Sequence, residues 1–354
     1  MLRKWGLAAA SALIAAAAVL AACSAKKSPE ELLRRAAEKA RDIRSYTFAG
    51  SLQVEGLLPL FGGADAGFTA PPNQPFQLEI TWSGVHRADP KLAEADLDIR
   101  FTSEMEIAFS LLVVMNQDKI WIRVPDVPFP RFPPEAAGRF IEIDQRSLAE
   151  EEGAPLSPQD LGALKPLYPE LVGVIFKHLD ENAYFTALSK KEAALPDGAD
   201  VKDVVRMKID KEHLRPFLET LVRQIAPEAL DLLAREEYRQ LHGIDPAELE
   251  KMKRELAEYA ETELEQDLQR IEEMPDPFTI TADIGVNREG YVTWLDLTVD
   301  AGIQDARERP GRFRLRAKSE LTGINAEPQF RYGEPQDVLT LEELMNLFVR
   351  RRTM

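Results

Sequence analysis

Residues able to do acid–base, metal or nucleophilic chemistry are scattered through this 354-residue sequence. Its histidines show no metal-binding spacing such as H-E-x-x-H, and there is no Gly-rich phosphate loop or G-x-S-x-G turn. Two acidic runs, 148–153 and 263–273, could supply an acid–base pair, but in the second the acidic residues lie off an apolar helical stripe, as on a solvated face. We therefore expect no enzyme activity, no metal and no cofactor, and solvated or capping roles for the four histidines: His86, His178, His213 and His242.

The only cysteine, Cys23, ends an apolar run that is preceded by Arg3 and Lys4. Basic residues, an apolar stretch and small residues in this order are typical of a secretory signal, and the stretch is short for a spanning helix of about 20 residues. Leu20-Ala21-Ala22-Cys23 resembles the lipobox of bacterial lipoproteins, whose cysteine carries a diacylglycerol. We expect a signal peptide at 1–22 and a lipidated tether at 23–27; a signal cleaved without lipidation, or an uncut signal anchor, is the alternative.

The charge of the chain argues against two classes of partner. The formal net charge is −16, and loss of Arg3 and Lys4 with the signal would make it more negative. Nucleic-acid binding needs a basic surface, and adhesion to anionic headgroups needs a polybasic patch. We expect no nucleic-acid partner and attachment to the membrane through the two acyl chains of the anchor, with no internal disulfide because the cysteine is alone.

Alternating apolar and polar residues predict a large antiparallel sheet. Asn116-Gln117-Asp118 and Asn287-Arg288-Glu289-Gly290 are turn sequences between such strands. The Pro-rich stretches 57–75 and 124–134 are expected as loops at one rim of the sheet. The expected strands are "SYTFAGSLQVEG", the segments around 76–82, 97–101 and 105–115, "KIWIRVP", "RFIEID", "DVVRMKID", "FTITADIGV", "YVTWLDLTVD" and "RFRLRAKSELTGI".

Apolar residues at helical spacing predict the remaining elements. Ser28-Pro29-Glu30-Glu31 is typical of a capped helix start, and that helix should run to about Arg44. Residues 157–188 are expected to be helical, and 211–271 to form two long antiparallel helices, a hairpin of about 211–274 broken around Gly243. A capped helix from Thr340 to about Arg350 should close the chain.

The order of these elements resembles the bacterial lipoprotein-carrier superfamily of LolA, LppX and LprG and uncharacterised Gram-positive lipoproteins of the same pattern. The resembling stretches are "AAEKARDIRSYTFAGSLQ", "VVMNQDKIWIRVP" and "IGVNREGYVTWLDLTVD". The resemblance implies an α+β fold over residues 28–354, in which a curved antiparallel sheet, an incomplete barrel, wraps helices, and acyl chains of lipids lie between the two. The long, charged segment 211–274 departs from a compact carrier and would be an insertion.

Large side chains on the expected strands are candidates for lining a ligand cavity. They are Phe48, Trp82, Phe109, Trp121 and Trp294. A filled core between sheet and helices gives the same periodicity, so the pattern leaves both open. The favoured expectation is a non-catalytic envelope lipoprotein that binds an acyl-chain or other lipid-like ligand at the outer face of the cytoplasmic membrane. The second is an envelope interaction protein with a solid core, whose acidic helices bind another protein; an extracytoplasmic hydrolase is third.

The lipobox generates the first testable prediction. Replacing Cys23 by alanine should abolish both the acyl mass on the mature N-terminus and the retention of the protein in the membrane fraction, because the thiol is the attachment point. Mass spectrometry of the N-terminal peptide and cell fractionation measure the two effects. A Cys23→Ala protein that is processed and membrane-bound like the wild type would show that the cysteine is not the anchor.

Overall fold

A computed structural model describes residues 27–57, 75–125, 132–145, 164–242, 244–273, 275–304 and 310–352. The expected signal peptide and Cys23 lie outside the described residues, as do most of the two Pro-rich loops and the expected helix start at 157–163.

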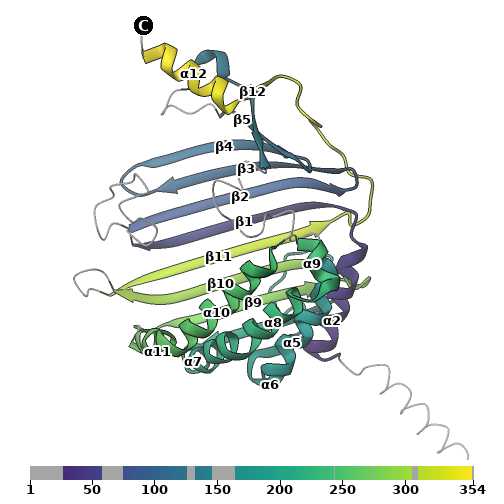
Figure 1. The fold of residues 1–354 in the computed structure, drawn as a ribbon, viewed down its shortest axis with the longest axis vertical. Helices are drawn as coiled ribbons and strands as arrows, with labels where there is room; N and C mark the ends of the chain where they lie inside the picture. The colour runs from purple at the N-terminus through teal and green to yellow at the C-terminus, as the bar shows by residue number, and fades with distance from the viewer. Residues whose placement is uncertain are drawn as a thin grey trace, which may run out of the picture.

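Twelve strands of the described chain form one open sheet (Figure 1). Their order is β12-β6-β5-β4-β3-β2-β1-β11-β10-β9-β8-β7, and every neighbouring pair is antiparallel except β12 and β6. The edge strands β12 and β7 do not meet, so the sheet is not closed. The strands are β1 Ser45–Leu57, β2 Pro75–Ala88, β3 Lys91–Thr102, β4 Glu106–Met115, β5 Lys119–Arg123, β6 Phe140–Asp144, β7 Phe185–Leu188, β8 Asp203–Asp210, β9 Phe278–Val286, β10 Val292–Gln304, β11 Pro310–Thr322 and β12 Val338–Thr340.

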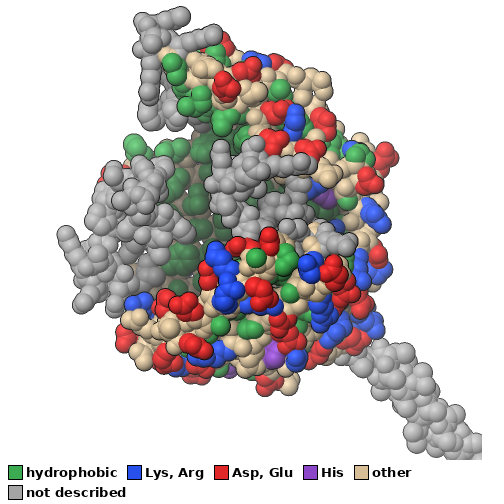
Figure 2. All heavy atoms as spheres, in the orientation of Figure 1, with side chains coloured by type: hydrophobic (Ala, Val, Ile, Leu, Met, Phe, Trp, Pro, Cys, Tyr) green, Lys and Arg blue, Asp and Glu red, His purple; other side chains and the backbone are tan. Residues whose placement is uncertain are grey.

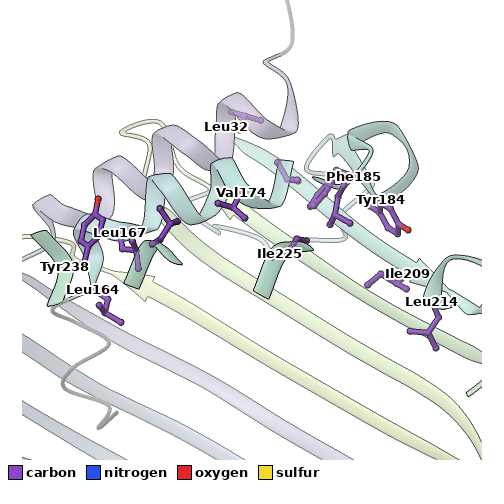
Figure 3. Close-up of a cluster of buried hydrophobic side chains, with 13 residues drawn as sticks. Leu32, Leu164, Leu167, Val174, Tyr184, Phe185, Ile209, Leu214, Ile225 and Tyr238 are labelled. Atoms are coloured by element: carbon purple, nitrogen blue, oxygen red, sulfur yellow. The ribbon is translucent and has the colours of Figure 1, made fainter. Parts of the chain in front are cut away.

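Helices pack on one face of the sheet, which we call the inner face, at the β7–β9 end (Figure 1). The first is α2 (Pro29–Lys39), which begins as expected with the Ser28 hydroxyl accepting a hydrogen bond from the Glu31 amide at 3.2 Å. It lies beside α5 (Tyr168–His178), and both contribute to a buried cluster with β8 (Figure 3). The cluster includes Leu32, Leu167, Val174, Val205, Ile209 and Leu214.

The helical segments are shorter and more divided than the periodicity predicts. The region expected to be helical to residue 188 ends in the short α6 (Glu181–Tyr184) and turns into strand β7. Residues 211–233 form α7 (Lys211–Thr220), a π-helical turn (Leu221–Ile225) and α8 (Ala226–Leu233). They are followed by α9 (Glu236–His242), α10 (Pro246–Thr262) and α11 (Leu264–Glu273). The break before α10 falls where expected, with Asp245 capping the Ala247 amide at 2.7 Å.

The C-terminal segment packs at the opposite edge of the sheet. Helix α12 (Leu341–Arg352) begins with Thr340, whose hydroxyl and amide exchange hydrogen bonds with Glu343, so the expected cap is confirmed. Its Leu344 is buried against Leu339 and Val124 beside β6. The α+β class with a large, unclosed and mostly antiparallel sheet is thus confirmed, with helices over one end of its inner face.

No helix within the described ranges is long and apolar enough to cross a membrane.

The buried cluster at the β7–β9 end generates the second prediction. Leu167→Ala should lower the free energy of unfolding by about 2–5 kcal/mol, because Leu167 is 1% exposed and its loss leaves a cavity. Leu341→Ala, at a position 56% exposed, serves as the control and should change stability by less than about 0.5 kcal/mol. Urea denaturation measures both; equal effects of the two substitutions would contradict this account of the core.

Candidate functional site

The antiparallel register aligns apolar side chains into rows that cross the inner face. One row runs from β4 to β9 through directly paired positions: Phe109, Ile99, Ile80, Leu52, Ala317, Leu297 and Ala282. Residues two apart along a strand share a face, so Phe101, Leu97, Trp82 and Leu315 extend this row on either side. The helices cover the inner face at β7–β9, where Val205 is fully buried. The middle strands instead present a wide apolar surface.

Side chains of this surface are only half-buried among the residues of the described chain. Leu52, Ile80, Trp82 and Phe109 all have intermediate exposure, and Ile107 and Leu295 at its margins are 44% and 36% exposed. Figure 2 shows hydrophobic side chains gathered in a hollow between the helical layer and the α12 end of the molecule. We call this surface, from β10 to β4, the inner apolar surface.

The opposite, outer face carries ion pairs over β8 to β11. Arg206 on β8 makes a two-point ion pair with Asp283 on β9, with N–O distances of 2.6 Å. Arg316 on β11 pairs in the same way with Asp296 on β10, and Arg312 with Asp300. Ion pairs therefore line this part of the outer face, as expected for an antiparallel sheet with one polar face.

Two glycines let aromatic rings lie flat on the inner apolar surface. A Cβ atom on Gly50 of β1 would sit 2.4 Å from the Trp82 ring, and one on Gly84 of β2 would sit 2.4 Å from the Phe48 ring. Each ring therefore occupies the space left by a glycine on the neighbouring strand. The rings contribute a flat, apolar floor instead of projecting across the hollow.

The five aromatic residues singled out from the sequence do not share one face. Phe48, Trp82 and Phe109 lie on the inner apolar surface. Trp121 and Trp294 lie on the outer face, so the expectation that they line the same space is corrected. The difference follows from strand parity, since Trp294 alternates with Leu295 and lies on the side of Asp296.

Both outer tryptophans are buried under other parts of the chain. Trp121 is 3% exposed, packs with Leu92 and Val114, and donates from Nε1 to Glu142 at 3.0 Å. Trp294 is 8% exposed and packs with Val201 and Val204. They are core residues of two small clusters on the outer side.

One end of the inner apolar surface is polar, where β1 begins and β2 ends. The rings of Tyr46 and His86, paired across these strands, stack with centroids 4.7 Å apart. The Nδ1 atom of His86 is buried and has no hydrogen-bond partner. Burial, together with the charges of Lys165 and Lys91, lowers the pKa of His86 to about 4. His86 is therefore neutral at physiological pH, and its side chain is half-buried with Nδ1 enclosed, unlike the solvated or capping histidine that the sequence led us to expect.

Lys165 borders the same polar end from the helical side. It begins a 3₁₀ turn (Lys165–Leu167) before α5, and its Nζ donates to the carbonyl of Ile43 at 3.2 Å. Burial and the nearby charge of Arg44 lower the pKa of this lysine. Burial also raises the pKa of Tyr46. Strand parity with Trp82 and Gly84 could have placed His86 on the inner face, but no sequence signal links residue 165 to it.

Two other histidines are engaged in ion pairs on the helices. His178 lies 2.7 Å from Glu228, and His213 lies 2.6 Å from Asp210. In the second acidic run, Glu265 and Glu272 pair with Arg215, while Leu264 and Leu268 are buried, so this run is a solvated helix face. The first run lies outside the described residues. Across the described ranges, no three His, Cys, Asp or Glu side chains are grouped so as to hold a metal ion.

The buried histidine generates the third prediction. The pKa of His86 is about 4 in the folded protein, whereas that of a histidine without such contacts is 6.5. As the pH falls, the unfolded chain therefore binds the extra proton before the folded chain does. His86 should therefore cost folding stability as the pH falls from about 6.5 towards 4. His86→Phe keeps the ring against Tyr46 and should show a smaller loss of unfolding free energy over this range in urea titrations. Identical pH profiles for the two proteins would contradict the burial of His86.

Comparisons with known proteins place few constraints on this site. No protein-family model matches the chain, and no curated protein matches it. A solved structure entitled "Lipid-protein interactions in lipovitellin" aligns with 83% of this chain at 10% identity and a TM-score of 0.25. The alignment spans 26% of that longer protein. A likeness at this level carries no conclusion about function, so the functional argument rests on the geometry of the chain itself.

Proposed function

We propose that this chain is a non-catalytic, lipid-anchored protein of the cell envelope that holds an acyl-chain or similar apolar ligand against the inner apolar surface. The observation that carries the proposal is a contrast in burial. Hydrophobic residues on the outer face are sealed under the chain, with Val114 and Trp121 at 0% and 3% exposure. In the middle of the inner face, Leu52, Ile80 and Phe109 are half-exposed, whereas Val54 and Phe76 at the far end of β1 and β2 are 3% and 6% exposed. Contiguous apolar surface that a chain leaves partly uncovered is typical of a binding site.

The shape of the surface favours an elongated ligand. The strands β1 and β2 pair over residues 45–57 and 75–87, so the apolar rows continue along them as well as across the sheet. From Tyr46 to Leu52, the last half-exposed apolar position on β1, six residue steps span about 20 Å at 3.3 Å per residue. The flat rings of Phe48 and Trp82 lie along this path. An acyl chain lying along β1 would meet hydrocarbon or aromatic carbon over this length.

The expected lipidation of Cys23 supports a location at the outer face of the cytoplasmic membrane. Helix α2 begins at Pro29, so residues 24–28 form the whole spacer between that cysteine and the helical layer. An anchor at Cys23 would hold the sheet close to the bilayer, which is the source of acyl chains.

A solid-core interaction protein, the alternative from the sequence, has less support. Its binding element would be the acidic helices, yet several of their carboxylates are already paired within the chain. Arg215 alone contacts Glu219, Glu265 and Glu272. Lys253 contacts Asp231 and Glu250. These pairs reduce the charge that the helices can offer to a basic partner.

The proposal predicts which tryptophan reports binding. Titration with dodecanol should change the intrinsic fluorescence saturably, and Trp82→Phe should remove that change because Trp82 lies on the inner apolar surface. Trp121→Phe, the matched control on the outer face, should keep it. A protein whose emission does not respond, or responds equally in the Trp82→Phe variant, would not bind the ligand at this surface.

A blocking pair of variants tests the same surface without relying on fluorescence. Ala317 of β11 lies in the central inner row, whereas Ala49 of β1 lies on the exposed outer face. Ala317→Phe should weaken dodecanol binding, measured by calorimetry, while Ala49→Phe should not. Equal affinities in both variants would place the ligand elsewhere.

A further inference from the structure

Basic side chains lie at the polar end of the inner apolar surface. The cations Lys165 and Lys91 act on His86, and Arg44 acts on Lys165. Within the part of the chain that the structure describes, burial and the charge of Arg44 act on Lys165, and no described Asp or Glu side chain is paired with it. The chain as a whole has 60 acidic and 44 basic residues. A partly buried lysine with no carboxylate partner among the described residues is unusual in so acidic a protein, and it is able to bind an anion.

The same end also has unused hydrogen-bonding capacity. An ammonium group donates three hydrogen bonds, and Lys165 uses one on the carbonyl of Ile43. The buried Nδ1 of His86 has no partner. Because His86 is neutral, its imidazole carries one N–H, which can be placed on Nδ1 and donated. Two donors at one end of an apolar track, one of them charged, match the head of an amphiphile.

We propose that Lys165, together with His86, binds the anionic headgroup of the ligand, and that the ligand class is an acyl chain ending in a carboxylate. This inference rests on the proposed function, because it assigns the polar end of the same site. The chain of the ligand would start beside Tyr46 and His86 and run along β1 and β2 over Phe48 and Trp82. Lys165 reaches this end from the turn before α5, so the headgroup would also bridge the helical layer and the sheet.

A purely structural role for Lys165 predicts a different result. Its hydrogen bond to Ile43 ties the turn before α5 to the segment that leads into β1, and a purely structural brace would affect ligands of every charge equally. If Lys165 instead binds the headgroup, its substitution should weaken only the binding of an anionic ligand. The test therefore compares ligands that share a chain and differ in the headgroup.

The experiment titrates the full chain, stripped of co-purified lipid, with dodecanoate, dodecanol and dodecyltrimethylammonium at pH 8 by calorimetry, each below its micelle concentration. The wild type should bind dodecanoate about tenfold more tightly than dodecanol, as expected for one charge-assisted hydrogen bond, and the cation most weakly. Lys165→Gln should reduce dodecanoate affinity to that of dodecanol and leave dodecanol unchanged. Lys165→Arg should restore the preference. Lys318→Gln, on the outer face of β11, is the matched control and should change nothing.

Each other outcome is decisive. If the wild type binds dodecanoate and dodecanol equally, the headgroup assignment is wrong while the apolar site stands. If Lys165→Gln weakens all ligands together, or keeps the preference for dodecanoate, Lys165 is a brace and the assignment is again wrong. If no ligand binds the wild type, the proposed function fails as well. Should Lys165→Gln not fold, the order of the three affinities in the wild type still decides the sign of the headgroup.

Discussion

The constraint on which this structure depends is the period of two along its long antiparallel strands. Side chains on alternate positions point to opposite faces, so a shift of register by one residue would exchange every apolar and polar position. Over β1 and β2 the register is unbroken for thirteen pairs, and it continues through β11 and β10 without a shift until Trp294. The ion pairs of the outer face, such as Arg316 with Asp296, hold only in this register. The inner apolar surface is therefore a direct result of strand pairing.

The helical layer is too small to cover the sheet that supports it. It fills the inner face at β7–β9 with a close-packed cluster around Ile209 and Val205, whose 1% and 0% exposures are typical of a protein core. Around Leu52, Ile80 and Phe109 in the middle of the sheet, the described chain supplies no comparable cover, and the strands keep their apolar side chains there. The same sheet thus provides a core at one end and an apolar surface in the middle. This division separates the stability of the fold from the site we propose.

The polar end of the surface shows how two distant parts of the chain make one environment. His86 and Tyr46 come from neighbouring strands near the N-terminus, and Lys165 comes from a turn that is held against the segment leading into β1 by its bond to Ile43. Burial of the imidazole keeps it neutral, which preserves a donor without adding charge. Positive charge and a free donor at the end of a hydrocarbon track are a combination that a packed core would not retain.

The sequence by itself determined the elements whose signals are local. Alternation predicted nearly all of the strands, and cap residues predicted the starts of α2, α10 and α12 at Ser28, Asp245 and Thr340. It also contained the parity that places Trp294 with Asp296 and away from Leu297. Periodicity overestimated helix lengths, because it does not register the turn into β7 or the division of 211–273 into separate helices.

Only the tertiary structure decided which face of the sheet is covered, and by what. Trp121 and Trp82 have the same strand signal, yet Trp121 is sealed under Phe330 and Val338 from the far end of the chain, and Trp82 lies on the half-exposed inner side. The proximity of Lys165 to His86 is likewise invisible in one dimension, since it joins segments almost eighty residues apart. Local sequence sets the direction of each side chain relative to its own strand. Burial and charge depend on what another part of the chain places against it.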